Sequence, residues 1–120
     1  MKKDPSLFLE HIMDSIDKIE TYTNSITEQE FQKSFEIQDA VIRRISVIGE
    51  ASRNLPASFK KKHHEVNWRD INAMRNILIH EYFGVKVKKV WRTVQEDIPG
   101  LKEKVSELLR NLKTDNKLGL

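Results

Sequence analysis

The chain has no cysteine, so disulfide bonds and thiolate metal sites are excluded. Only 4 glycines and 3 prolines occur among 120 residues, which argues against a turn-rich β-sandwich and favours helices. No apolar run approaches the roughly 20 residues that a membrane-spanning helix needs. A chain of this length normally makes one domain, so these absences predict a single all-α domain.

Charge of one sign is not dominant either, since the net charge is only +3. Its distribution is uneven: residues 1–60 hold 8 Lys/Arg against 10 Asp/Glu, and residues 61–120 hold 13 against 8. The C-terminal half therefore suits a polyanionic partner, although charge-rich helical proteins show such a bias by chance. Residues 1–5 have no apolar run behind them, so we expect no signal peptide, no membrane association and a cytoplasmic location.

Periodicity and capping signals divide the chain into about five to six helices. We expect a first helix from Asp4 as N-cap to about Thr23, and then a capping box at 27–30 that precedes a long helix over 34–54. Further helices should run from Asn67 as cap to 83–84, over 86–97 and over 99–113. A basic connector should occupy residues 55–67. Short connections predict antiparallel packing in an up-and-down bundle. Residues 1–120 should form one domain with a core over 4–113 and a frayed tail at 114–120.

The segment from Arg75 to Tyr82 sets polar groups into an otherwise apolar helix. At about 100° per residue, one side of this helix should face the core and carries Met74, Ile77 and Leu78. A second side carries Arg75, Asn76, His80 and Tyr82, together with Ile79 and Phe83. This mixture is typical of a contact surface that contains a polar site, because a solvated face would lack the apolar residues.

These residue types suit cleavage of a phosphodiester by an internal nucleophile such as the 2′-hydroxyl of RNA. Histidine exchanges a proton near neutral pH, so His80 could move the proton. The fork of Arg75 could stabilise the charge that builds on the phosphorane-like transition state. Asn76 could orient His80, its neighbour four residues on, or hold a phosphate oxygen. A two-fold dimer would supply the second histidine that acid and base roles require.

A simpler interpretation of the same residues stays open. His80 could be a hydrogen-bonded interface histidine, and Arg75 could pair with a carboxylate such as Asp70 or Glu50, the latter as a buried partner. Spacing alone does not decide between these roles and catalysis.

The pattern R-x-x-x-x-H-x-Y, here Arg75 to Tyr82, resembles the signature of the HEPN superfamily (higher eukaryotes and prokaryotes nucleotide-binding) in its HepT-like branch. The resemblance covers roughly residues 4 to 112. Further segments look like the family's landmarks in the same order: Gln38–Arg43, Ile48–Ala51, Trp68–Ile71, Met74–Asn76, His80–Val85, Val90–Trp91 and Asp97–Pro99. One departure is Lys86, where family members often have an Asp that caps the following helix.

The resemblance implies a homodimeric all-α bundle and a metal-independent ribonuclease that acts as the toxin of a toxin–antitoxin pair. It implies that Arg75 and His80 are catalytic in a cleft between protomers, with Asn76 in a supporting position. The implied partner is an MntA-like nucleotidyltransferase antitoxin that transfers AMP to Tyr82. No cofactor and no metal are expected.

Two further groups of residues have competing interpretations. The basic connector Lys60–His64 could contact the RNA backbone or be a solvated loop, and its adjacent histidines do not predict a metal site. Trp68 and Trp91 could stack bases, but an all-α context favours core positions.

Three hypotheses for the whole chain follow. They are a ribonuclease toxin, a non-catalytic module that binds a nucleotide or a partner in the same cleft, and a structural dimer whose Arg and His pair across the interface. The intact Arg75, His80 and Tyr82 favour the first.

Overall fold

The computed structural model describes residues 4–80 and 87–117, with side chains described for 4–76 and 87–114. The helices are α1 (Pro5–Thr23), α2 (Glu28–Lys33), α3 (Phe35–Asn54), α4 (Ala57–Lys62), α5 (Trp68–His80), α6 (Val87–Arg92) and α7 (Ile98–Lys117), and a π-helical segment, Thr93–Asp97, joins the last two. No strand occurs within the described ranges, so the predicted all-α class is confirmed. None of the helices there is both long and apolar enough to cross a membrane.

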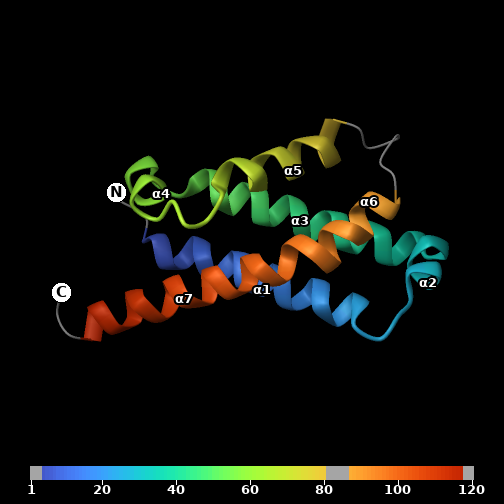
Figure 1. Ribbon diagram of the computed structural model, residues 1–120, viewed down its shortest axis with the longest axis horizontal. Coiled ribbons are helices and arrows are strands. Elements are labelled where there is room, and N and C mark those ends of the chain that lie inside the picture. The colour runs from blue at the N-terminus through green and yellow to red at the C-terminus, as the bar shows by residue number, and fades with distance from the viewer. Residues whose placement is uncertain (1–3, 81–86, 118–120) are drawn as a thin grey trace.

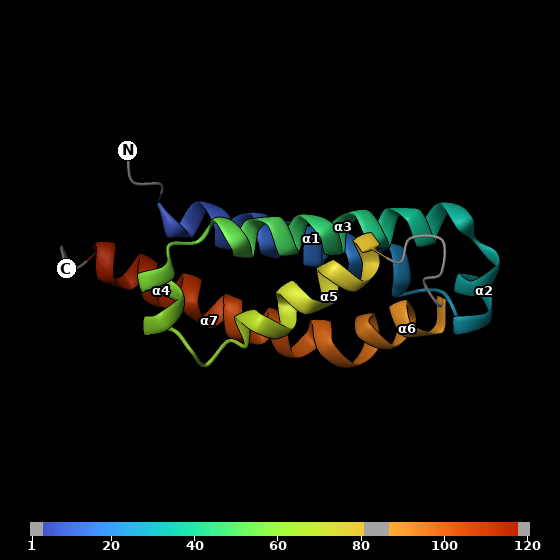
Figure 2. The ribbon, with the colours of Figure 1, turned by 90° about the horizontal axis from the view of Figure 1, so that it is seen from above.

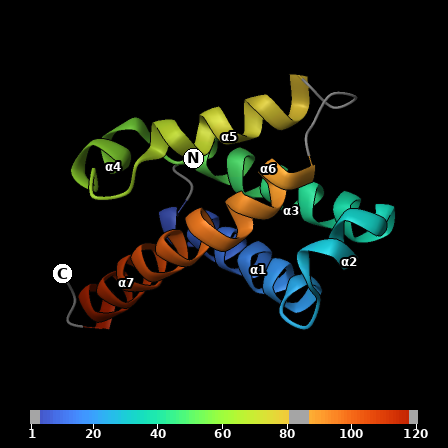
Figure 3. The ribbon, with the colours of Figure 1, turned by 45° about the vertical axis from the view of Figure 1, so that its right-hand side comes forward.

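The long helices lie side by side along the molecule (Figures 1 and 2). α3 packs against α1 on one side and against α5 on the other, and α1 also packs against α7. Figure 3 shows that α5 lies on the outer side of α3, away from α1. The helix that carries the Arg75 motif is therefore attached to the bundle mainly through α3.

The predicted helix starts are confirmed by their capping hydrogen bonds. The Asp4 carboxylate accepts from the Ser6 amide at 3.0 Å and Pro5 opens α1. Thr27 and Glu30 exchange both bonds of a capping box, at 2.9 and 3.1 Å. The side chain of Asn67 accepts from the backbone amide of Asp70 at 3.2 Å, which satisfies a free donor in the first turn of α5.

The core lies where the periodicity predicted it. Residues expected to face inward on the first and third helices are at most 9% exposed: Phe8, Leu9, Ile12, Ile16, Ile19, Val41, Ile45 and Ile48. Ile37, expected on the same face, is only partly buried because it lies near the start of α3. Trp91 packs against Phe31 with ring centroids 5.2 Å apart, as expected of a core tryptophan.

The C-terminal helices differ from expectation in two respects. Pro99 was expected to open a separate helix, but the chain stays helical from Val87 to Lys117, with a π-type bond from the Ile98 amide to the Thr93 carbonyl. Such a wider turn accommodates a proline, whose missing N–H and bulky ring disturb an ordinary α-turn. α7 also continues past 113 to Lys117, because no helix-breaking residue occurs before Gly119. The predicted glycine cap at Gly84 and the departure at Lys86 lie outside the described residues.

Candidate functional site

Arg75 lies where α5 crosses α3, directly over Gly49. A Cβ atom at position 49 would come within 2.6 Å of the Arg75 Cβ and 2.7 Å of its Cγ, and the Cδ lies closer still. Atoms of neighbouring side chains do not approach so closely, so only glycine permits this crossing. The aliphatic part of Arg75 therefore packs on the bare backbone of α3.

The guanidinium group is held by two neighbours. Its Nη2 donates to the Glu50 carboxylate in an ion pair, and its Nη1 donates to the Asn76 side-chain oxygen at 3.3 Å. The Arg75 side chain is 14% exposed, and its buried Nε has no hydrogen-bond partner among the described residues. These contacts fix the cation in one orientation.

The carboxylate that pairs with Arg75 is thus Glu50 rather than Asp70. The expectation that this partner is buried is wrong, because the Glu50 side chain is 53% exposed on the outer side of α3. The pair is consequently solvated at its acidic end and covered at its basic end. An anion that approaches from solvent shares the guanidinium group with Glu50, which occupies one of its N–H donors.

Asn76 contacts Arg75 in the described part of the chain. An arginine only donates hydrogen bonds, so the contacting Asn76 atom must be its carbonyl oxygen. The two N–H donors of the Asn76 amide have no partner among the described residues, and Asn76 lines a groove. Asn76 therefore lies between the guanidinium group of Arg75 and the solvent-accessible groove.

The remaining motif residues are placed less completely. His80 is the last residue of α5, one turn beyond Asn76, and its side chain lies outside the described residues. Tyr82 also lies outside them. The structure thus brings together Arg75, Asn76 and Glu50, and the roles of His80 and Tyr82 stay predictions.

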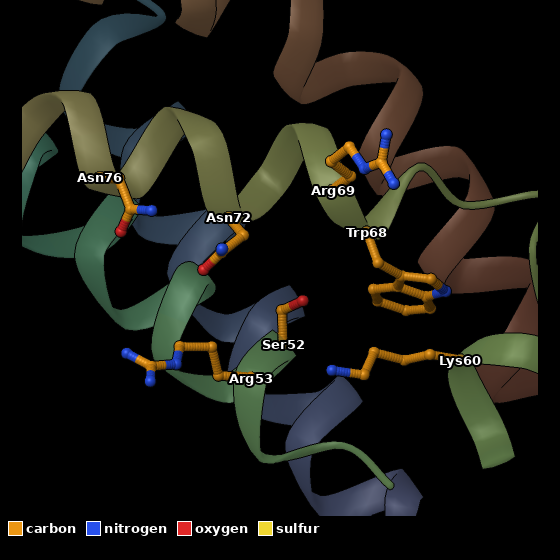
Figure 4. Close-up of a pocket in the computed structure, with 7 residues that line it drawn as sticks. All are labelled: Ser52, Arg53, Lys60, Trp68, Arg69, Asn72 and Asn76. Carbon is orange, nitrogen blue, oxygen red and sulfur yellow. The ribbon is translucent and has the colours of Figure 1, made fainter. Parts of the chain in front are cut away.

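The groove beside Asn76 has a volume of about 530 Å³ and lies between α3, α4 and α5. Figure 4 shows the seven residues that line it: Ser52 and Arg53 from α3, Lys60 from α4, and Trp68, Arg69, Asn72 and Asn76 from α5. Three of these residues are cationic and none is acidic. The groove is therefore a positively charged hollow that ends next to Arg75.

The residues of the basic connector lie in different environments. Lys60 lines it, whereas Lys61 and Lys62 are exposed elsewhere on α4. The His63 ring packs on Phe59 with centroids 4.5 Å apart, and its Nδ1 lies 3.3 Å from a carboxylate oxygen of Glu65. A backbone hydrogen bond, and then this histidine, lower the pKa of Glu65. The connector is thus partly ordered rather than a freely solvated loop.

Comparison with known proteins gives a consistent result. The family described as "Ribonuclease HepT-like" matches residues 12–108, most of the chain. The chain belongs to the HepT-like ribonuclease family.

Individual relatives of this HepT-like chain agree with that assignment. A Thermococcus cleftensis protein named "Probable ribonuclease HepT" is 46% identical over 108 residues, which cover 90% of this chain and 98% of that protein. A Caldanaerobacter subterraneus protein named "Putative RNase TTE0752" is 39% identical, with 92% and 99% covered. No solved structure matches the chain significantly.

One relative is longer. A Methanocaldococcus jannaschii protein named "Gamma-glutamylcyclotransferase and putative RNase MJ0434" is 46% identical over 112 residues, and the alignment covers 93% of this chain. The chain spans only 50% of that relative's length. The similarity therefore applies to part of that protein.

Sequence reasoning missed the contact of Gly49 with Arg75 and most of the groove. The spacing of Trp68, Asn72 and Asn76, four residues apart, was a visible signal for one wall of the groove, because such residues share a helix face. Arg53 and Lys60 carried no such signal, since they come from other helices.

Proposed function

We propose that this HepT-like ribonuclease is a metal-independent endoribonuclease toxin in which Arg75 and His80 cleave RNA. The observation that carries the proposal is the fixed guanidinium group of Arg75, held on Gly49 by Glu50 and Asn76. A preorganised cation stabilises charge that develops in a transition state without a reorganisation cost. Family membership supplies the reaction class.

In the proposed reaction, the RNA 2′-oxygen forms a bond to the adjacent phosphorus and the bond to the 5′-oxygen breaks. His80 takes the proton from the 2′-hydroxyl, and a second acid, which a dimer would supply, protonates the leaving 5′-oxygen. Arg75 stabilises the negative charge on the non-bridging oxygens. The products are a 2′,3′-cyclic phosphate and a 5′-hydroxyl, and the reaction needs no metal ion or cofactor.

The proposal places the site in a cleft between two protomers. It is supported by the attachment of α5 mainly to α3, which leaves the outer side of the motif helix available, and by the single motif histidine in each chain. Light scattering should therefore give a dimer at the concentrations used for cleavage. A fully active monomer would overturn this part of the proposal.

Cleavage is tested with single-stranded RNA in the presence of EDTA. We expect cleavage to persist in EDTA and to fall by 10²–10⁴-fold in His80→Ala, the range for loss of a general acid or base. The matched control is His11→Ala, which removes an exposed histidine from α1. Loss of cleavage in EDTA, or equal activity of the two variants, would contradict the assignment.

We further propose that an MntA-like nucleotidyltransferase antitoxin silences the enzyme by transferring AMP to Tyr82. The transfer joins the tyrosine oxygen to the α-phosphorus of ATP and releases pyrophosphate. The added charge two residues from His80 would repel RNA phosphates. The chain offers a matched control because its only other tyrosine is Tyr22.

The modification is tested by intact mass after co-expression with such an antitoxin. Wild type and Tyr22→Phe should gain one or more AMP units and lose cleavage, whereas Tyr82→Phe should gain none and stay active. Equal mass gain in all three proteins would show that the antitoxin modifies another residue.

The non-catalytic binding module remains the second candidate. The groove beside Arg75 favours this candidate, because a positively charged groove can bind a nucleotide without cleaving it. RNA binding without cleavage, unchanged in His80→Ala, would support this alternative.

A further inference from the structure

The groove between α3, α4 and α5 adjoins the Arg75 site at Asn76, and its other lining residues have no role in the proposed cleavage step. Its polar lining consists of donors: the cations of Arg53, Lys60 and Arg69, the amides of Asn72 and Asn76, and the hydroxyl of Ser52. Only the amide and hydroxyl oxygens can accept. Such a lining suits a ligand rich in acceptors, above all phosphate oxygens.

The three cations are not neutralised within the protein. None of Arg53, Lys60 and Arg69 forms an ion pair with a described residue, and no carboxylate lines the groove. The three cations line one hollow without a carboxylate among them, so the groove carries a net positive charge. A bound polyanion would neutralise that charge and release counterions.

Trp68 adds an aromatic surface to the same wall. Its only polar atom, Nε1, donates to the His63 carbonyl at 3.0 Å, so the indole is held in place from the protein side. The ring packs partly on the core and also lines the groove, where Figure 4 shows it beside the Lys60 side chain. A base can stack at low entropic cost on a ring that is held in place and whose N–H is already satisfied.

The groove is continuous with the candidate active site. Trp68, Asn72 and Asn76 follow one another at four-residue intervals along α5, and His80 occupies the next position in that row. At 1.5 Å per residue, this row extends about 18 Å along the helix from Trp68 to His80. Asn76 belongs both to the groove and to the Arg75 contacts. A strand in the groove would therefore lead into the site.

We propose that this groove is a binding subsite for single-stranded RNA, in which Trp68 stacks a base and Lys60, Arg53 and Arg69 hold backbone phosphates on one side of the scissile bond. The inference rests on the proposed ribonuclease function, since the groove would bind the part of the same RNA that flanks the scissile bond. Binding here is sequence-tolerant, because every base has a face that can stack and every nucleotide has a phosphate.

Binding is measured apart from cleavage by using a fluorescein-labelled, single-stranded 2′-O-methyl oligouridylate, which has no free internal nucleophile. The test variant is Lys60→Gln with Arg69→Gln. The matched control is Lys61→Gln with Lys62→Gln, which removes the same charge from exposed positions outside the groove. Fluorescence anisotropy over a range of salt concentrations gives the affinity and its salt dependence.

The test variant should bind about tenfold more weakly than wild type at 0.1 M salt. The slope of log affinity against log salt should become shallower by about 1.4, since each phosphate contact on a single strand contributes about 0.7. The control pair should change both quantities much less. Equal losses in the two pairs would overturn the subsite, because net charge alone would then explain the binding.

Trp68→Phe and Trp68→Leu separate stacking from packing. Both remove the hydrogen bond to His63, but phenylalanine keeps a ring that can stack. We expect Trp68→Leu to bind about tenfold more weakly than Trp68→Phe, a difference within the range for loss of one stacked base. Equal affinity of two folded variants, shown by matching circular dichroism, would contradict the stacking role.

Cleavage of an ordinary RNA distinguishes failure of this inference from failure of the proposed function. If wild type cleaves RNA and the groove variants cleave and bind like wild type, the groove is not a subsite although the nuclease stands. If wild type cleaves nothing but the groove variants lose affinity, the subsite stands and the nuclease proposal fails. Unchanged RNA binding with lost binding of the antitoxin would make the groove a protein-docking surface.

Discussion

Gly49→Ala is the sharpest test of how the candidate site is built. The new Cβ would stand 2.6 Å from the Arg75 Cβ, and that atom cannot rotate away because it is attached directly to the α5 backbone. Either α5 moves off α3 or the side chain at 49 strains its own helix. Overpacking of this kind typically costs 1–3 kcal/mol. The gain in helix propensity from glycine to alanine offsets about 0.5–1 kcal/mol of that cost.

The midpoints of these two ranges leave a net destabilisation of about 1.25 kcal/mol, which lowers Tm by roughly 5 °C in a domain of this size. RNA cleavage should fall as well, because Arg75 loses its position. Gly100→Ala is the matched control, since a Cβ there meets nothing within 4 Å. It should raise Tm by about 2–4 °C through helix propensity alone.

Both variants are compared with wild type by thermal unfolding at one protein concentration, because Tm of a dimer depends on concentration. If Gly49→Ala raises Tm as Gly100→Ala does and leaves cleavage intact, the close crossing of α5 over α3 at this position is refuted.

Three further outcomes follow from individual contacts. Glu50→Gln keeps a hydrogen-bond acceptor for Arg75 but removes the charge. We expect kcat to fall about tenfold, which is less than the loss that a misplacement of about 1 Å can cause. The free energy of unfolding, measured in urea, should fall by under about 1 kcal/mol. Asn67→Ala removes the cap of α5 and should cost about 1 kcal/mol in the same assay, whereas Asn67→Asp should cost little. The hydrogen bond from Lys102 to Glu20, at 2.9 Å, raises the pKa of Lys102 above 10.5. Its stabilisation is complete below pH 10.5 and is lost as the pH rises through the raised value, so the difference in Tm between wild type and Lys102→Met should shrink at alkaline pH.

Local signals in the sequence predicted most of the helices. Asp4 with Pro5, and Thr27 with Glu30, carry capping information within a few residues, so the starts of α1 and α2 could be placed from the sequence. The junction before Pro99 could not, because whether a proline ends a helix or is accommodated by a wider turn depends on the packing of both flanking segments.

The site was predictable to the extent that it lies on one helix. Arg75 and Asn76 are adjacent on α5, and Glu50 was one of two carboxylates considered for the arginine. The exposure of Glu50 was not predictable, because it depends on the crossing of α5 over α3. The groove was hidden for the same reason: Arg53, Lys60 and Trp68 belong to three helices, and only the fold brings them together.

The placement of Arg75 bears on the proposed dimer and the proposed cleavage step. Within one chain, Arg75 packs on Gly49 and hydrogen-bonds to Glu50 and Asn76. These contacts orient the guanidinium group within one chain. In the proposed dimer, the partner protomer would contribute the second proton-transfer group. Glu50 accepts from Nη2 and Asn76 from Nη1, so each terminal nitrogen keeps a second N–H that a phosphate oxygen can accept while both contacts persist. Because the Glu50 side chain is 53% exposed, its carboxylate can orient Arg75 while it stays hydrated.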